Sequence, residues 1–191
     1  MKRLIFAMML LVGLTATAQT GHLTFKGVPI DGTLNSFVGK LKQKGFTLIG
    51  TEQGLALLKG DFAAYKGCTV LVYQHESGIV NRVGVMFPDK DTWSTLYNDY
   101  SNLKDMLTQK YGEPAKVTEE FQGYVSPYTD DDDKMHSVRM DRCKYICDFF
   151  TDNGIIELRI SHSGYSKCCV VLVYMDAENE KKVQDSAIED L

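Results

Sequence analysis

The chain has 191 residues and a formal net charge of −4 at pH 7, from 25 acidic and 21 basic side chains. The chain is mildly acidic, and its Lys and Arg residues do not form a cluster. Both features disfavour nucleic acid and anionic lipid as partners. After the first eighteen residues, the chain is long enough for one domain with a hydrophobic core that does not require disulfides. We expect no membrane span in that part of the chain.

The first eighteen residues predict a secretory signal peptide. Lys2 and Arg3 precede a short apolar run over residues 4–14, and the sequence "ATA" provides a cleavage site between Ala18 and Gln19. The apolar run is too short to span a membrane, and no cysteine follows it that could carry a lipid anchor. We therefore expect an exported protein, periplasmic or secreted, whose mature chain begins at Gln19.

Two segments show the periodicity of amphipathic helices. The first begins after Thr33, ends at Gly45, and places its apolar side chains at i, i+3, i+4 and i+7: Leu34, Phe37, Val38 and Leu41. The second is longer, with Asp91 as its predicted cap, Gly112 at its end and Pro114 preventing a restart. Its apolar stripe consists of Trp93, Leu96, Tyr97, Tyr100, Leu103, Leu107 and Tyr111.

A pair of β-rich runs follows each helix and a connecting segment. The first pair lies around Ser77-Gly78 and the second around Asn153-Gly154, a strong hairpin signal. The chain thus uses one unit twice, over about residues 19–90 and 91–176. "HLTFKGVPI" precedes the first unit as a strand, "YSKCCVVLVYM" follows the second, and a polar helix over about 177–190 closes the chain. We predict a single α+β domain over residues 19–191, an antiparallel sheet with two main helices packed on one face.

Hairpin register predicts which side chains share a face of the sheet. A two-residue turn at Asn153-Gly154 places Cys147 opposite Ile160, and a turn at Ser163-Gly164 places Leu158 opposite Cys169. The resulting core face holds Cys143, Tyr145, Cys147, Phe149, Ile156, Leu158, Ile160, Cys169, Val171 and Val173. The opposite face is open, and its residues are the candidate binding surface: Ile146, Asp148, Glu157, Arg159, Val170, Leu172 and Tyr174.

The five cysteines are compatible with buried free thiols, with one disulfide, or with a metal ligand or nucleophile. Cys143 and Cys147 are four residues apart on one strand, roughly 13 Å, too far for a disulfide. The cysteines also lack the C-x₂-C spacing of a zinc knuckle. Free thiols on core faces are the favoured interpretation, and we expect no metal or cofactor.

No catalytic motif is present, and no catalytic residue is predicted. The sequence contains no G-x-S-x-G, H-E-x-x-H, phosphate-binding or dinucleotide-binding pattern. His162 near Cys168 or Ser166 could pair a base with a nucleophile, but strand alternation points His162 and Cys168 to opposite faces. His162 and His75 are therefore interpreted as turn histidines.

The run "DDDDK" is predicted to be an exposed acidic loop formed by Asp130, Asp131, Asp132, Asp133 and Lys134. The second unit has about eight more residues between its helix and hairpin than the first, and the run lies in this excess. Four consecutive carboxylates do not converge on one point as calcium requires, so we predict an extended, solvated segment. The run also resembles the recognition sequence of enteropeptidase, which would cut after Lys134.

The layout, with "LTQKYGEPAKV" leading toward a strand, resembles β-lactamase inhibitory protein and the small outer-membrane assembly lipoproteins. The export signal and the layout also resemble small secreted proteins of Gram-negative gut bacteria. The two named families lay helices on an antiparallel sheet and bind other proteins. The chain lacks the lipobox cysteine of the lipoproteins, and no binding residue of either family has a match here. Together with the expected fold, the missing catalytic set and the open sheet face, this resemblance predicts a non-enzymatic binding module for another envelope or extracellular protein. A homo-oligomer is compatible with the sequence. The alternative is a small secreted hydrolase.

Overall fold

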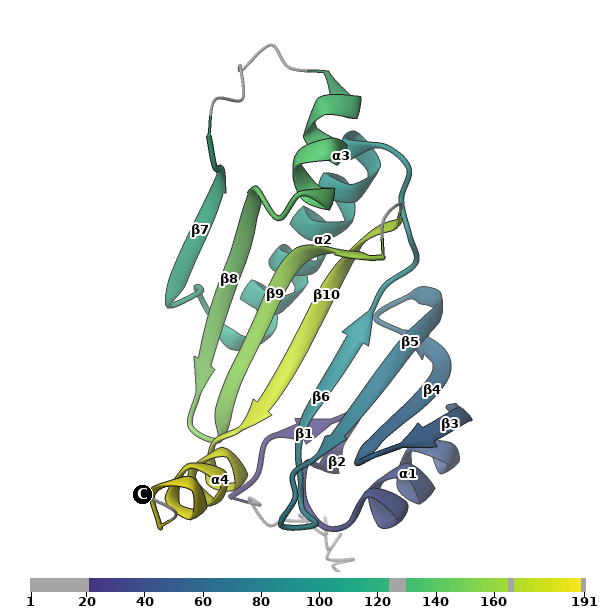
Figure 1. The fold of residues 1–191 in the computed structure, drawn as a ribbon, viewed down its shortest axis with the longest axis vertical. Coiled ribbons are helices and arrows are strands. Elements are labelled where there is room, and N and C mark those ends of the chain that lie inside the picture. The colour runs from purple at the N-terminus through teal and green to yellow at the C-terminus, as the bar shows by residue number, and fades with distance from the viewer. Residues whose placement is uncertain (1–20, 124–129, 165–166, 190–191) are drawn as a thin grey trace, which may run out of the picture.

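The computed structural model describes residues 21–123, 130–164 and 167–189. An eight-stranded antiparallel sheet dominates this part of the chain, with the strand order β3-β4-β5-β6-β10-β9-β8-β7 (Figure 1). A two-stranded sheet of β1 (Thr24–Phe25) and β2 (Val28–Pro29) lies beside it. The predicted α+β class with an antiparallel sheet is confirmed.

Each half of the large sheet comes from one helix-then-strands unit. The first unit contains α1 (Leu34–Gln43), β3 (Thr47–Glu52), β4 (Leu55–Phe62), β5 (Tyr65–Gln74) and β6 (Val80–Met86). The second contains α2 (Trp93–Tyr111), β7 (Lys116–Phe121), α3 (Asp131–Arg139), β8 (Cys143–Thr151), β9 (Gly154–Ser163) and β10 (Lys167–Asp176). The two units join where β6 pairs with β10, and α4 (Ala177–Glu189) follows.

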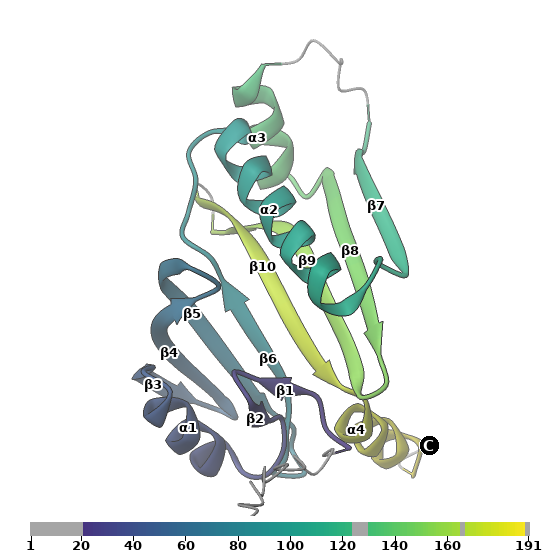
Figure 2. The ribbon, with the colours of Figure 1, turned by 180° about the vertical axis from the view of Figure 1, so that it is seen from behind.

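The main helices cover the same face of the sheet, as Figure 2 shows from behind. Helix α1 packs against β3, β4 and β5, whereas α2 packs against β8, β9 and β10. Thr33 and Thr92 cap these helices, so the predicted cap at Asp91 is one residue early. The buried side chains follow the predicted stripes, except that Tyr97 is exposed and Tyr111 is half-buried: Leu34, Phe37, Val38, Leu41, Trp93, Leu96, Tyr100, Leu103 and Leu107.

Some strands differ from the prediction. The segment expected as one strand over residues 22–30 is a short hairpin, because Lys26 and Gly27 have positive φ angles of 52° and 74° and reverse the chain. The segment expected to connect α1 with the first hairpin instead forms β3 and β4. Gln53 and Gly54, both with positive φ, make the turn between them.

The acidic run does not form an extended loop, so that prediction is wrong. Asp130 is the N-cap of α3, and its side chain accepts a hydrogen bond from the Asp133 backbone N–H at 3.0 Å. Carboxylates are favourable in the first turn because the helix macrodipole presents its positive end there. Met135 and Val138, on the next turns, are buried against the domain. The segment just before the run, residues 124–129, lies outside the described residues.

The register of the second hairpin also corrects the predicted faces. Cys147 lies opposite Leu158 rather than Ile160, a shift of two residues that leaves the faces unchanged. Leu158 lies opposite Leu172 rather than Cys169, an odd shift that turns every β10 side chain to the other face. The cause is one additional residue between β9 and β10, which end and begin at Ser163 and Lys167.

All five cysteines are free and buried. The inversion of β10 places Cys168 on the core face and Cys169 on the other, the reverse of the prediction, but both are fully covered. Burial raises the pKa of every one of these thiols, to about 12 for Cys143 and Cys169. Within the described ranges, no helix has the length and apolar character needed to cross a bilayer.

Candidate functional site

The candidate site is the face of the large sheet opposite α1 and α2, which faces the viewer in Figure 1. Strand alternation places Leu71 of β5, Met86 of β6 and Val171 and Val173 of β10 on this face. These side chains come from both units and meet across the β6–β10 junction. The apolar strip that they form exists only because the two halves are joined edge to edge.

A groove of about 690 Å³ lies along this strip. Its lining comes from β5, the turn after it, β6, β9, β10 and one residue of α4: Leu71, Tyr73, Gln74, His75, Asn81, Arg82, Gly84, Met86, Glu157, Arg159, Ser161, His162, Val171, Val173, Met175 and Val183. Gly84 lies between Leu71 and Val173 in the sheet and contributes no side chain, which deepens the groove at its centre. The volume is within the range of small-ligand pockets.

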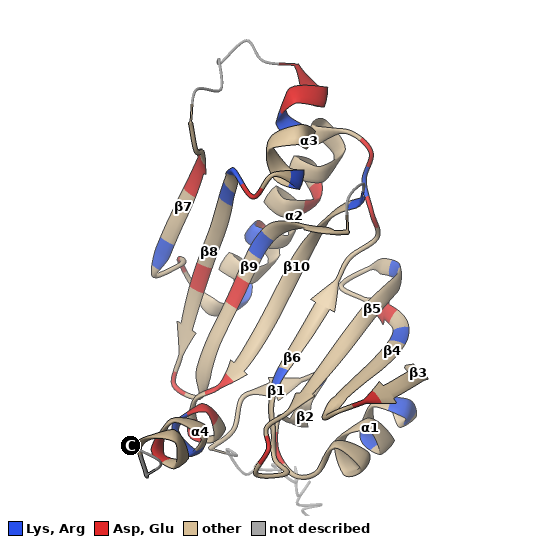
Figure 3. Ribbon diagram, in the orientation of Figure 1, with Lys and Arg blue, Asp and Glu red and all other residues tan. Residues whose placement is uncertain are grey.

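Charged side chains flank the apolar strip in pairs. Arg82 donates from Nε and Nη2 to the two carboxylate oxygens of Glu180 on α4, and this hydrogen bonding raises the pKa of the guanidinium. Arg159 donates from Nη1 to Glu157 Oε1 at 2.9 Å. In Figure 3 these charges lie on β6, β9 and α4, while β10 is uncharged between its ends. The groove therefore has an apolar floor with polar sides.

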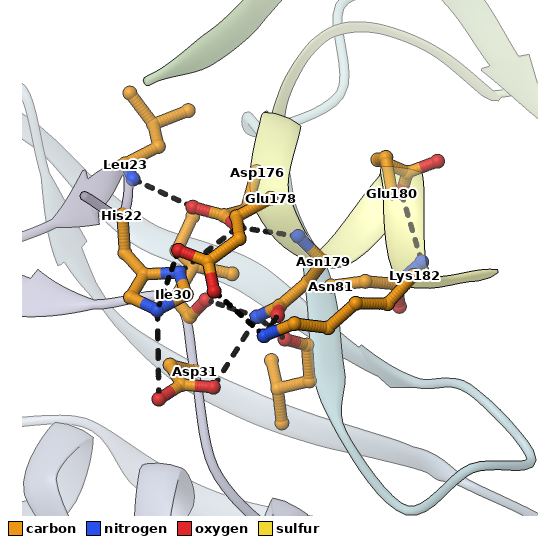
Figure 4. Close-up of polar contacts among 11 residues, drawn as sticks. His22, Leu23, Ile30, Asp31, Asn81, Asp176, Glu178, Asn179, Glu180 and Lys182 are labelled. Carbon is orange, nitrogen blue, oxygen red and sulfur yellow. Dashed lines mark hydrogen bonds and ion pairs between the residues drawn. The ribbon is translucent and has the colours of Figure 1, made fainter. Parts of the chain in front are cut away.

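A network of polar groups fixes α4 beside the groove (Figure 4). Asp176 at the end of β10 is fully buried and accepts hydrogen bonds from His22 Nδ1 at 3.0 Å, Leu23 N at 2.7 Å and Asn179 N at 2.9 Å. The side-chain amide of Asn179 donates to the carbonyl oxygens of Ile30 at 2.9 Å and Val80 at 3.1 Å. These contacts join the first described residues to α4, the helix that brings Glu180 and Val183 to the groove.

The predicted binding residues divide between the two faces. Ile146, Asp148, Glu157 and Arg159 lie on the open face, and of these Glu157 and Arg159 line the groove. The other three predicted residues are buried on the core face, so their assignment to the open face is wrong: Val170, Leu172 and Tyr174. Because β10 is inverted, its other alternate residues lie on the open face instead: Val171, Val173 and Met175.

The first unit contributes groove residues that the sequence analysis did not single out. On the core face, β5 and β6 bury Val70, Val72, Val83 and Val85. Their alternate neighbours belong to the open face by the same period of two: Leu71, Tyr73, Arg82, Gly84 and Met86. The alternation along β5 and β6 could therefore have identified these residues from the sequence. The pairing of β6 with β10, which brings them to the second unit, could not.

The titratable groups at the groove have local structural contacts. His75 Nδ1 lies 3.1 Å from Ser77 Oγ within one turn, and His162 lies 2.9 Å from the Gly164 carbonyl oxygen and 3.2 Å from Asp141 Oδ1. Across the described ranges, no group of three or more His, Cys, Asp or Glu residues has an arrangement that could hold a metal ion.

A scan of protein-family models and searches of curated proteins and of solved structures found no match to this chain.

Proposed function

We propose that the chain is an exported, non-enzymatic binding module that holds an envelope or extracellular partner in the groove of its open sheet face. The observation that carries this proposal is the apolar strip of Leu71, Met86, Val171 and Val173 at the junction of the two units. The strip is partly exposed at Leu71, Met86 and Val173, and an apolar strip with charged sides has the organisation of a binding interface, in which a desolvated centre is surrounded by a polar rim.

The charge arrangement favours binding over hydrolysis. Arg82 is engaged by Glu180, and Arg159 is engaged by Glu157. Catalysis by acid and base groups requires side chains poised to exchange protons with a substrate, and sites of this kind are usually marked by displaced pKa values. Arg82 carries its positive charge throughout the physiological pH range, and its two hydrogen bonds to Glu180 suit a role in positioning α4 and a partner.

The partner that best fits is a protein segment with an apolar or aromatic side chain. Such a side chain would enter the groove above Gly84 and displace water from Met86 and Val173. The hydroxyl of Tyr73 and the ion pairs at the sides would remain available for polar contacts at the rim. The open face is continuous across both units, so a partner can extend beyond the groove along β8 or β4.

A matched pair of methionine substitutions tests the proposal. The mature chain, immobilised, is used to capture partners from the envelope of the cells that produce it, in parallel with Met86→Lys and Met106→Lys. Met86 lines the groove, whereas Met106 lies exposed on α2. We expect Met86→Lys to reduce the amount of captured partner at least about tenfold, because this variant places a charge in the apolar floor. Met106→Lys should capture as much partner as the unchanged chain. Equal retention by two variants with native-like melting would contradict the proposal.

A further inference from the structure

The outer edge of β3 is an open end of the large sheet. β3 pairs with β4 on one side, and no other strand of the described residues pairs with it. All six of its residues are exposed. A strand at the edge of a sheet presents unpaired backbone N–H and C=O groups, and these form hydrogen bonds with any strand that adds to it.

The two edges of the sheet are protected differently. At the other edge, β7 has the sequence KVTEEF and carries Lys116, Glu119 and Glu120, and such charges oppose the addition of another strand. β3 has the sequence TLIGTE, whose only charge is Glu52 at its last position. Its centre exposes apolar side chains, with Leu48 at 38% and Ile49 at 59% of their full accessible surface.

We infer that β3 is a self-association edge, where a second copy of this chain adds its own β3 in the antiparallel direction. A two-fold pair of this kind places the Glu52 end of one strand beside the beginning of the other, where Lys44 ends α1. Opposite charges then meet at both ends of the pair, while the apolar centres face each other. A parallel arrangement would instead place Glu52 beside Glu52.

The bulge in β3 favours a second copy over an unrelated strand. The register with β4 shifts between Leu48 and Gly50, and a bulge increases the local twist of a strand. Such a twist opposes the addition of a flat, unrelated strand, whereas two copies of β3 have the same bulge and the same twist and so remain compatible with each other. Because each strand has only six residues, the interface is small and the dimer is a reversible one.

This association leaves the proposed binding groove accessible. No residue of β3 lines the groove, and β4 lies between β3 and β5, the nearest strand that does line it. The dimer would therefore present two grooves on one extended sheet. The inference is independent of the proposed function, since each concerns a different surface of the domain.

Sedimentation velocity of the mature chain, from about 1 µM to about 500 µM, covers the range of weak protein association. Two isoleucines of equal exposure provide the variant and its control: Ile49→Lys on β3, at 59%, and Ile188→Lys on α4, at 58%. We expect a monomer–dimer equilibrium whose dissociation constant rises at least about tenfold in Ile49→Lys, because the two-fold axis brings two added charges together. Ile188→Lys should match the unchanged chain.

Amide hydrogen exchange provides the second measurement and does not depend on a variant. Exchange of outward-facing β3 amides should slow as the concentration of the unchanged chain rises, whereas exchange in β7 should not. A monomer over the whole concentration range would overturn the inference. So would a dimer that Ile49→Lys leaves intact and that does not protect β3, since that dimer would use another surface.

Discussion

Replacing Asp176 by Ala should destabilise the domain more than any other single change in the polar network. The carboxylate is fully buried and accepts hydrogen bonds from His22 Nδ1, Leu23 N and Asn179 N. Without it, the backbone N–H groups of Leu23 and Asn179 lose their acceptor, and both residues are buried. A buried donor left without a partner costs about 1–3 kcal/mol, so two donors give roughly 2–6 kcal/mol.

Other contributions act in opposite directions. The hydrogen bond from Asn179 N also caps α4. Its loss is already included in the estimate, because this N–H group is one of the two donors counted above. Removal of the carboxylate recovers part of the free energy needed to bury a charge. We expect a net loss of about 3–5 kcal/mol for Asp176→Ala, a large fraction of the roughly 5–15 kcal/mol that stabilises a domain. Asp176→Asn keeps one acceptor oxygen and should lose about half as much.

Urea unfolding monitored by circular dichroism measures these differences as changes in the free energy of unfolding. Asp185→Ala is the matched control, because Asp185 lies exposed on the same helix, and it should change the stability by less than about 0.5 kcal/mol. If Asp176→Ala unfolds at the same urea concentration as the control, Asp176 does not join α4 to the first described residues, and this account of the network is wrong.

Four further predictions concern the core, the thiols and α3. Leu103→Ala should cost about 2–5 kcal/mol because Leu103 lies on the buried face of α2, whereas Met106→Ala, one turn away and exposed, should cost little; equal small losses would count against the stripe. All five cysteines should react with a thiol reagent after denaturation without reductant, and a disulfide would lower that number. Burial raises the pKa of Cys143 from 9.0 to about 12. Between these two pH values, the thiol keeps its proton in the folded chain and loses it in the unfolded chain. This contribution to stability is complete below about pH 9 and is lost between pH 9 and 12, and unfolding free energies measured across that range should fall. Enteropeptidase should leave the native chain intact but cut the denatured chain after Lys134, because Met135 is buried in α3; rapid cleavage of the native chain would show that α3 opens readily.

Periodicity identified the parts of the fold whose signals are local. The stripe from Trp93 to Leu107 defines α2 because a helix buries every third or fourth residue, and Asn153 next to Gly154 marks the turn between β8 and β9. These features depend on neighbouring residues only. The repeated order of helix and strands followed from them, and it is the frame of the eight-stranded sheet.

The errors arose where one residue or a distant partner decides the outcome. The connection between Ser163 and Lys167 is one residue longer than the predicted two-residue turn. This difference inverted the faces of β10 and moved three of the predicted binding residues to the core face. The acidic run looked like a solvated loop, but Asp130 caps a helix that is stabilised by burial of Met135 and Val138. The groove itself depends on the pairing of β6 with β10, about ninety positions apart, which no local pattern contains.

Methionine oxidation footprinting of the unchanged protein tests whether the open face binds the partner. Met86 and Met175 line the groove and are partly exposed, whereas Met106 and Met140 are exposed outside it, at 45% and 53%. Mass spectrometry compares the oxidation rate of each methionine in the free chain and in the complex captured from the envelope. We expect slower oxidation of Met86 and Met175 in the complex, with Met106 and Met140 unchanged. Protection of Met106 or Met140 while Met86 and Met175 oxidise as in the free chain would contradict binding by the open face.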